Sequence, residues 1–229
     1  LNNTAKMDGS ENVNPTYLEV SFSNVCNFKC SYCSPAYSSA WMEEIQSQGA
    51  YPTSDKFNNL DWLRQQSKMP IPHREHNPYV DAFWKWWPDL YKTLKVFRIT
   101  GGEPLMSKDT FKVLDYINDN PNPQLEIAIN SNGCVPDKLF DQYIEKMKRI
   151  TLDGKIGVTR LYTSVDTFGE QAEYIRDGLD FNQWYDNICR VLTELPKTKI
   201  TIMCTTGLLS LPNFHKLVDI IHPLKREFY

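Results

Sequence analysis

The chain has 229 residues, of which 41% are hydrophobic and 23% are charged, a composition that is ordinary for a globular protein and excludes intrinsic disorder. Its formal net charge is −3 and it has no dense run of Lys or Arg, which disfavours nucleic acid or an anionic membrane as a partner. Because the sequence lacks both an apolar leader and an apolar run of about eighteen residues, we expect a cytoplasmic protein with no membrane contact.

Apolar runs alternate with amphipathic windows after a polar segment, 1–16, that we expect to be flexible. Alternating or β-branched apolar residues predict five strands, over 17–23, 95–100, 124–130, 158–166 and 198–206. Apolar residues three or four positions apart predict five helices, over 78–94, 107–119, 136–150, 180–195 and 212–224. Ser107 is a suitable N-cap for one of them, and Pro136 lies where a helix start tolerates proline.

This alternation of strands and helices favours parallel strands joined by right-handed crossovers. We therefore predict an α/β fold, a partial (β/α) barrel of five to six units, because a complete eight-unit barrel needs roughly 250 residues. The barrel core is expected to span 17–229 and to include a long insertion, 34–77, after the first strand. Such an insertion is longer than ordinary βα loops, so we expect it to be functional and partly helical.

The predicted helix over 78–94 is rich in aromatic residues. Tyr79, Phe83, Leu90 and Leu94 lie on one helical face together with Trp86 or Trp87. We expect the three tryptophans of this helix to pack in the core.

The stretch CNFKCSYC places Cys26, Cys30 and Cys33 directly after the first predicted strand. A structural zinc site normally needs four protein ligands, yet no cysteine follows until Cys134 and no histidine until His73. Three thiolates on one loop can hold three irons of a cubane cluster and leave the fourth iron open to a ligand. The alternative is a structural zinc site completed by a distant residue, in a non-catalytic zinc or iron–sulfur interaction protein.

Three further motifs follow predicted strands, and these are GGEP (101–104), NSNG (130–133) and SVD (164–166). Because the carboxyl ends of parallel strands build the active site in this architecture, we expect these motifs and the cysteines to share one rim. Taken alone, GGEP is also an ordinary strand-to-helix turn, and Asn132 before a glycine is typical turn chemistry.

The CxxxCxxC spacing, with Tyr32 before the last cysteine, resembles the signature of the radical S-adenosylmethionine (SAM) superfamily. The resemblance extends through GGEP, SVD and the Arg176 of YIRDG, and it is closest to members with a C-terminal twitch or SPASM auxiliary-cluster domain. It implies that Cys26, Cys30 and Cys33 ligate a [4Fe–4S] cluster whose open iron chelates SAM. Reduction would then give a 5′-deoxyadenosyl radical that abstracts hydrogen from a substrate.

The resemblance also implies a set of contacts to SAM. Tyr32 would lie near the adenine, Ser164 would meet the ribose or the carboxylate, and Arg176 would hold the methionyl carboxylate. Gly101, Gly102 and Glu103 would bind the methionyl amine, the two glycines because a backbone without Cβ can approach a ligand closely. Asn132 and Asp166 complete the set.

The same resemblance implies an external one-electron reductant of the flavodoxin or ferredoxin type. The expected substrate is a peptide or protein side chain, and no catalytic base is identified. Because the chain has no cysteine set for an auxiliary cluster, we expect the core to be truncated before an auxiliary domain.

The remaining cysteines and two histidines are explained more simply by core or surface positions than by a functional site. Cys189 and Cys204 are expected to be core residues. Cys134 lies close to the predicted rim, so a core position and a position at the site are both open for it. His73 and His76 lie in a proline-rich loop, where a surface role is favoured over metal binding.

Overall fold

A five-stranded parallel sheet forms the centre of the computed structural model, which describes residue 9 and residues 13–228. The strands in spatial order are β1 (Tyr17–Ser21), β3 (Val96–Thr100), β4 (Asn122–Ser131), β5 (Ile156–Ser164) and β7 (Thr198–Met203). The helices that follow them along the chain are α3 (Pro78–Tyr91), α4 (Lys108–Asp119), α5 (Asp137–Leu152), α7 (Phe181–Glu194) and α8 (Phe214–Phe228). The predicted partial (β/α) barrel is confirmed, with five units.

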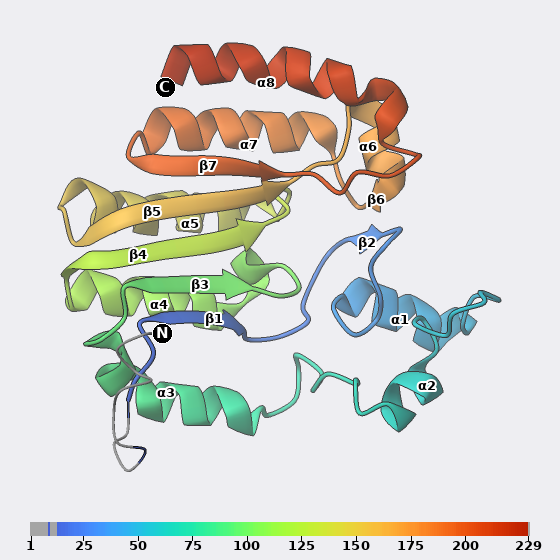
Figure 1. Ribbon diagram of the computed structural model, residues 1–229, viewed down its shortest axis with the longest axis horizontal. Coiled ribbons are helices and arrows are strands. Elements are labelled where there is room, and N and C mark those ends of the chain that lie inside the picture. Colours follow the sequence, from blue (N-terminus) through green and yellow to red (C-terminus); the bar gives the residue numbers. More distant parts are fainter. Residues whose placement is uncertain (1–8, 10–12, 229) are drawn as a thin grey trace.

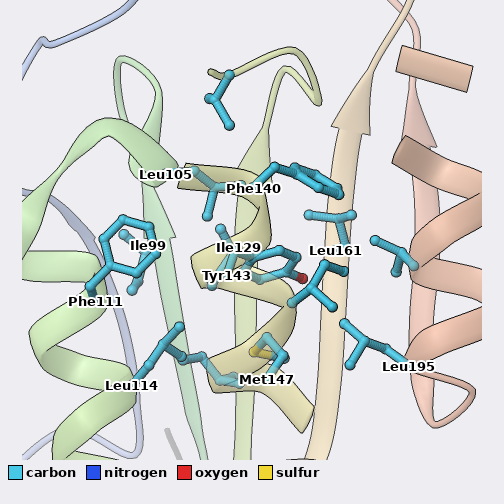
Figure 2. Packing of buried hydrophobic residues seen from close by; sticks show 14 of the residues in the cluster. Ile99, Leu105, Phe111, Leu114, Ile129, Phe140, Tyr143, Met147, Leu161 and Leu195 are labelled. Carbon is cyan, nitrogen blue, oxygen red and sulfur yellow. The ribbon is translucent and has the colours of Figure 1, made fainter. Parts of the chain in front are cut away.

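The helices lie on one face of this sheet. In Figure 1, α4 and α5 lie behind the strands, and within the part drawn as ribbon no helix crosses in front of β3, β4 or β5. Side chains alternate along each strand, so one face carries apolar residues such as Ile99, Ile129 and Leu161. Figure 2 shows these packed against Phe111 of α4 and Tyr143 of α5. The apolar core therefore lies between the sheet and its helices, and the other face of the sheet has no helical cover in this view.

The insertion 34–77 contains two helices, α1 (Ser39–Gln48) and α2 (Leu60–Gln65), in agreement with the prediction that it is partly helical. Each begins at a side-chain cap, because Ser38 accepts a hydrogen bond from the Trp41 amide and Asn59 accepts one from the Trp62 amide. Figure 1 places α1 beyond the carboxyl ends of the strands. The insertion thus lies at the edge where the functional motifs were expected.

Several short elements were not predicted from the sequence. They are β2 (Lys29–Cys30), β6 (Arg176–Asp177), the helix α6 (Gly169–Ile175) and the 3-10 turns η2 (Pro104–Met106) and η3 (Leu211–Asn213). Two-residue strands carry no periodic signal, so only the fold can reveal them. Within the described part of the chain, none of the helices has the length and apolar composition of a membrane span.

The aromatic face of α3 differs from the prediction at two positions. Trp87 is fully buried and its ring centroid lies 4.7 Å from that of Phe97. Trp86 is 38% exposed and donates to the side chain of Asn14, because neighbouring residues point about 100° apart around a helix. Tyr79 is 77% exposed and therefore does not pack in the core.

Most of the segment 1–16, for which flexibility was expected, lies outside the described residues. Its last part is held in place, since the Thr16 carbonyl accepts hydrogen bonds from the amides of Lys95 and Val96. The side chain of Asn14 also donates to the Asp89 carbonyl. These bonds fasten the segment before β1 to the start of β3 and to the end of α3.

Candidate active site

The three clustered cysteines lie in one cavity at the carboxyl ends of the strands. This cavity has a volume of about 290 Å³, and Cys26, Cys30 and Cys33 form part of its wall. The facing wall comes from the strand ends and the segment after β5, and its polar or glycine residues are Gly101, Gly102, Asn130, Ser131, Asn132, Ser164 and Arg176. The structure therefore brings together residues that are up to 150 positions apart in the sequence, from Cys26 to Arg176.

The cysteine loop is fastened by the insertion that follows it. Ser39 Oγ accepts from the Cys26 amide at 3.1 Å, and Ser38 Oγ donates to the Phe28 carbonyl at 2.6 Å. Trp41 Nε1 donates to the Cys30 carbonyl at 2.9 Å. These three residues belong to the start of α1 and its cap, so the insertion fixes the backbone that presents the thiols. No pattern in the sequence indicated this role.

A second fastening comes from the pairing of β2 with β6. This two-stranded antiparallel ladder sets Cys30 opposite Arg176 and Lys29 opposite Asp177. Lys29 Nζ forms ion pairs with Glu44 at 2.5 Å and with Asp177 at 2.8 Å. The segment after β5 is thereby placed against the cysteine loop.

Burial raises the pKa of Cys26 to about 12 and that of Cys30 to about 11, and it also raises the pKa of Cys33. The free thiols are therefore protonated at neutral pH, and a bound metal centre would deprotonate them on coordination. In the described part of the chain, no group of three or more His, Cys, Asp or Glu side chains is placed to hold one metal ion. A cubane takes each thiolate on a different iron, so these three cysteines fit a cluster better than a single zinc ion.

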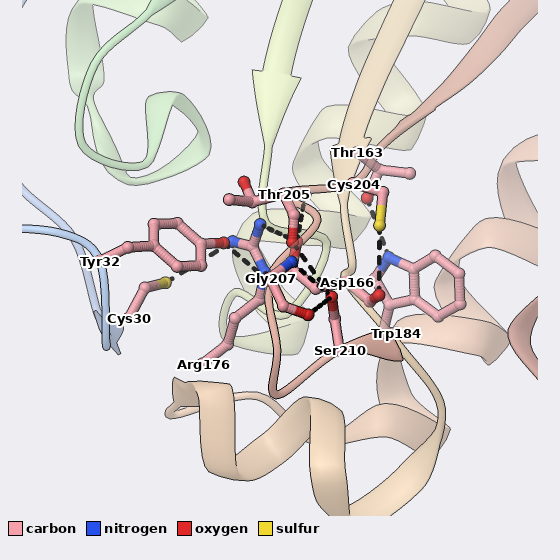
Figure 3. Close-up of polar contacts among 10 residues, drawn as sticks. All are labelled: Cys30, Tyr32, Thr163, Asp166, Arg176, Trp184, Cys204, Thr205, Gly207 and Ser210. Atoms are coloured by element: carbon pink, nitrogen blue, oxygen red, sulfur yellow. Dashed lines mark hydrogen bonds and ion pairs between the residues drawn. The ribbon is translucent and has the colours of Figure 1, made fainter. Parts of the chain in front are cut away.

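Arg176 and Asp166 form a buried ion pair beside Cys30 (Figure 3). Arg176 Nε and Nη2 donate to the two carboxylate oxygens at 2.9 and 3.1 Å, and Nη1 lies 3.5 Å from Cys30 Sγ. The Tyr32 hydroxyl and the Thr205 amide also donate to the Asp166 carboxylate, at 2.7 and 2.8 Å. Arg176 and Tyr32 line the cavity, as expected for cofactor contacts.

Asp166, which was expected to contact the cofactor, does not line the cavity. Its side chain is fully buried, and four donors from the protein occupy its two oxygens. Asp166 instead orients Arg176 and Tyr32, which do reach the cavity.

Glu103, which was expected to bind the methionyl amine, also lies outside the cavity wall. Its side chain is buried, accepts from the Leu105 amide and Ser131 Oγ at 2.9 Å, and accepts from the Asn132 amide at 2.6 Å. Burial raises the pKa of this carboxyl to about 7, against the opposing effect of the three hydrogen bonds. Glu103 thus lies behind the cavity wall and ties the loop after β3 to the loop after β4.

Replacing Glu103 with glutamine is expected to lower the free energy of unfolding by about 1–3 kcal/mol at pH 8. The new amide would present a donor to one of three groups that already donate, which leaves that buried donor without an acceptor. Urea unfolding followed by circular dichroism measures the change. Glu170→Gln, at an exposed position in the first turn of α6, is the control and should stay within about 0.5 kcal/mol of wild type. Equal stability of both variants would contradict this account of Glu103.

The glycines of GGEP line the cavity, but their missing Cβ atoms do not face it. A Cβ on Gly101 would lie 1.8 Å from Ser21 Oγ, and one on Gly102 would lie 2.3 Å from the Val25 carbonyl oxygen. Both residues have positive φ, +77° and +51°. Glycine is therefore required here for close packing of two protein loops, and the expected approach of its backbone to a ligand stays a prediction.

Ser164 and Asn132 line the cavity, as expected. Asn132 also makes the turn contact that its sequence context indicates, since its Oδ1 accepts from the Cys134 amide at 2.8 Å. Its Nδ2 donates to Asn27 Oδ1 at 2.8 Å, and Asn27 Nδ2 donates to the Cys134 carbonyl at 2.7 Å. Asn27 links the cysteine loop to the loop after β4, and its place inside CNFKC was the only available signal.

The other cysteines lie outside the cavity wall. Cys134 is buried and its thiol donates to the Asp180 carbonyl. Cys189 is half-buried against the core. Cys204 is half-buried at the end of β7, where its thiol donates to the Asp166 carbonyl, so the prediction of a core position is wrong for this residue. His76 is exposed and pairs with Asp81 at 2.6 Å, which agrees with a surface role.

A family model for the Radical SAM superfamily matches residues 20–222, so the chain belongs to this superfamily. Members of this superfamily use a [4Fe–4S] cluster and SAM. The cysteine cavity at the strand ends is the site in this chain whose donors fit these two groups.

Its relatives include GTP 3′,8-cyclases and a molybdenum cofactor protein. The GTP 3′,8-cyclase of Pectobacterium atrosepticum is 29% identical over 173 residues, 75% of this chain and 41% of that protein. Molybdenum cofactor biosynthesis protein moc-5 of Caenorhabditis elegans is 26% identical over 213 residues, 92% of this chain and 28% of that protein. The GTP 3′,8-cyclase of Vibrio cholerae is 28% identical over 202 residues, 86% of this chain and 49% of that protein. The chain thus spans between about a quarter and a half of these relatives.

Proposed function

We propose that this protein reductively cleaves SAM at a [4Fe–4S] cluster and uses the 5′-deoxyadenosyl radical to abstract hydrogen from a substrate. The observation that carries the proposal is the set of three thiols on one wall of a cavity whose other wall is made by strand ends. When bound, the cluster and SAM supply the electron transfer and the radical, whereas the protein supplies binding and orientation.

Seven residues of the cavity wall have a role in this proposal. Cys26, Cys30 and Cys33 hold the cluster. Arg176 places a positive charge beside Cys30 and the cavity, where it stabilises the thiolate and can bind a carboxylate. Ser164 offers a hydroxyl to the ribose or carboxylate of SAM, and the backbone at Gly101 and Gly102 faces the methionyl amine.

Two further components of the proposal are the reductant and the substrate. The cluster requires one electron from an external donor, and a flavodoxin- or ferredoxin-type protein would supply it. A peptide or protein side chain is the substrate expected from the sequence, and it stays a prediction. The names of the relatives support a different class, since the cyclases are named for GTP.

Anaerobic reconstitution with iron and sulfide tests the proposal. A protein with about four irons per chain is expected to release 5′-deoxyadenosine when dithionite and SAM are added. Serine at Cys26, Cys30 or Cys33 should abolish both the cluster absorbance and this release, because a hydroxyl does not replace a thiolate as an iron ligand. Cys189→Ser, at a half-buried cysteine away from the cavity, is the matched control and should retain both.

Two results would contradict the proposal. One is a fully loaded [4Fe–4S] protein that releases no 5′-deoxyadenosine. The other is a colourless protein with one zinc per chain whose fold melts on chelation, which would favour the non-catalytic alternative.

A further inference from the structure

The sheet face opposite the helices carries a row of charged side chains. Strand pairing sets Glu19 of β1 beside Arg98 of β3, and the row continues through Ala128 of β4, Arg160 of β5 and Lys199 of β7. Their neighbours in sequence, such as Phe97 and Leu161, point into the core on the other face. Arg98, Arg160 and Lys199 thus lie at the same register position across the sheet, together with the acidic residue Glu19.

The two arginines of this row are positioned by contacts that leave most of their donors unused. Arg98 Nε donates to Asn130 Oδ1 at 3.0 Å, and its guanidinium carbon lies 4.4 Å from the ring centroid of Tyr162. Its Nη1 forms an ion pair with Glu19 at 3.8 Å, a distance longer than a hydrogen bond. The terminal Nη nitrogens of Arg98 accordingly have no hydrogen-bond acceptor among the residues that the structure describes.

Arg160 and Lys199 likewise carry side-chain donors without an acceptor among the described residues. Arg160 Nε donates to Glu126 at 2.6 Å, and its Nη nitrogens have no acceptor within the described ranges. The side chains of Arg98 and Arg160 are 23% and 29% exposed, so an incoming ligand can reach them. Lys199 is exposed and has no ion pair with any described residue. Between the arginines, Ala128 contributes only a methyl group and is 2% exposed, so the neighbouring side chains cover it and a ligand would meet the ends of the arginines rather than the sheet itself.

This row adjoins the cysteine cavity. Asn130 lines that cavity and is also the acceptor for Arg98. It lies two residues beyond Ala128 on β4, so the cavity begins roughly 7 Å from the row along the strand. A ligand held on the row therefore extends directly to the edge of the cavity.

We propose that this row binds the substrate and that the substrate carries several oxyanion charges, as the phosphates of a nucleotide do. The inference rests on the proposed function, because it takes the adjoining cavity to hold the cofactor. Guanidinium groups offer paired donors that match phosphate and carboxylate oxygens. A lone carboxylate needs one such group, whereas cations on β3, β5 and β7 span roughly 14 Å across the strands, which suits a polyanion.

Equilibrium binding measured by calorimetry at fixed salt tests the proposal with three probes, which are tripolyphosphate, GTP and citrate. Arg160→Gln and Lys199→Gln should each weaken binding of the preferred probe by about tenfold or more. Arg149→Gln and Lys138→Gln, at exposed positions of α5 outside the row, are the matched controls and should stay within about twofold. Preference for tripolyphosphate and GTP over citrate assigns the oxyanion to phosphate, and the reverse preference assigns it to carboxylate.

The Lys199 side chain has no ion pair with any described residue, so Lys199→Gln is expected to fold. It therefore keeps the test valid even if Arg160→Gln disturbs the sheet by removing the Arg160–Glu126 ion pair. Equal affinities in wild type, row variants and controls would overturn the proposal, as would the absence of binding by all three probes at millimolar concentration. Because binding needs neither reduction nor SAM, it is independent of 5′-deoxyadenosine release. A wild-type protein that releases 5′-deoxyadenosine but shows no row-dependent binding would refute this inference alone, and the opposite result would refute the proposed function alone.

Discussion

Replacing Arg176 with alanine is expected to lower the free energy of unfolding by about 3–5 kcal/mol, because it leaves the fully buried Asp166 carboxylate without its cation. The same change removes the positive charge 3.5 Å from Cys30 Sγ, so the yield of cluster after reconstitution should fall as well. Urea unfolding and iron content per chain are the two measurements.

Two comparisons make this prediction specific. Arg149→Ala removes an arginine from an exposed pair with Glu145 and should change stability by less than about 1 kcal/mol. The double variant Arg176→Met with Asp166→Leu removes both charges and should recover much of the loss, since no unpaired charge stays buried. An Arg176→Ala protein as stable as wild type would show that Arg176 and Asp166 do not stabilise each other.

Replacing Gly102 with alanine is expected to cost about 2–5 kcal/mol of folding free energy and most of the cluster. The positive φ of +51° accounts for about 1–2 kcal/mol of this cost. Overpacking adds about 1–3 kcal/mol, because the new Cβ would lie 2.3 Å from the Val25 carbonyl oxygen, a backbone atom that cannot rotate away. Val25 precedes Cys26, and its carbonyl accepts from the Glu103 amide at 2.6 Å, so relief of the clash would displace the cysteine loop.

Gly154 provides the control for the energetic cost of the positive φ alone. It has a φ of +66°, and an added Cβ there would meet no atom within 4 Å. Gly154→Ala should therefore cost only the conformational part, about 1–2 kcal/mol, and leave iron binding unchanged. If Gly102→Ala is no more destabilising than Gly154→Ala, the close approach of the two loops is not what requires glycine.

Much of the fold could be predicted from the sequence, because the signals that specify it are local and periodic. The five parallel strands and the helices that follow them appear as alternating and amphipathic patterns, and the observed boundaries of β3 and α4 differ from the predictions by one residue at one end. The N-cap at Ser107 was also predictable, since its side chain bonds the amide of Asp109, two residues on.

The sequence likewise located the candidate site. The cysteine spacing and the motifs after the strands were enough, because parallel strands bring their carboxyl ends to one edge. What the sequence could not separate was a residue in the cavity wall from one behind it. Glu103 and Asp166 belong to the same motifs as Gly102 and Ser164, yet both carboxylates are turned into the protein. Their donors include Ser131, 28 positions from Glu103, and Thr205, 39 positions from Asp166.

The order of strands and helices and the clustering of thiols follow from the amino-acid sequence, because they depend on residues close together in the chain. The three-dimensional fold was needed to show which side chains face the cavity, why Gly101 and Gly102 must lack Cβ, and how Arg98, Arg160 and Lys199 come to share a row. These features depend on the register between strands and on contacts between distant loops. A shift of one residue in register would turn all three cations towards the core, and no local pattern reveals that pairing.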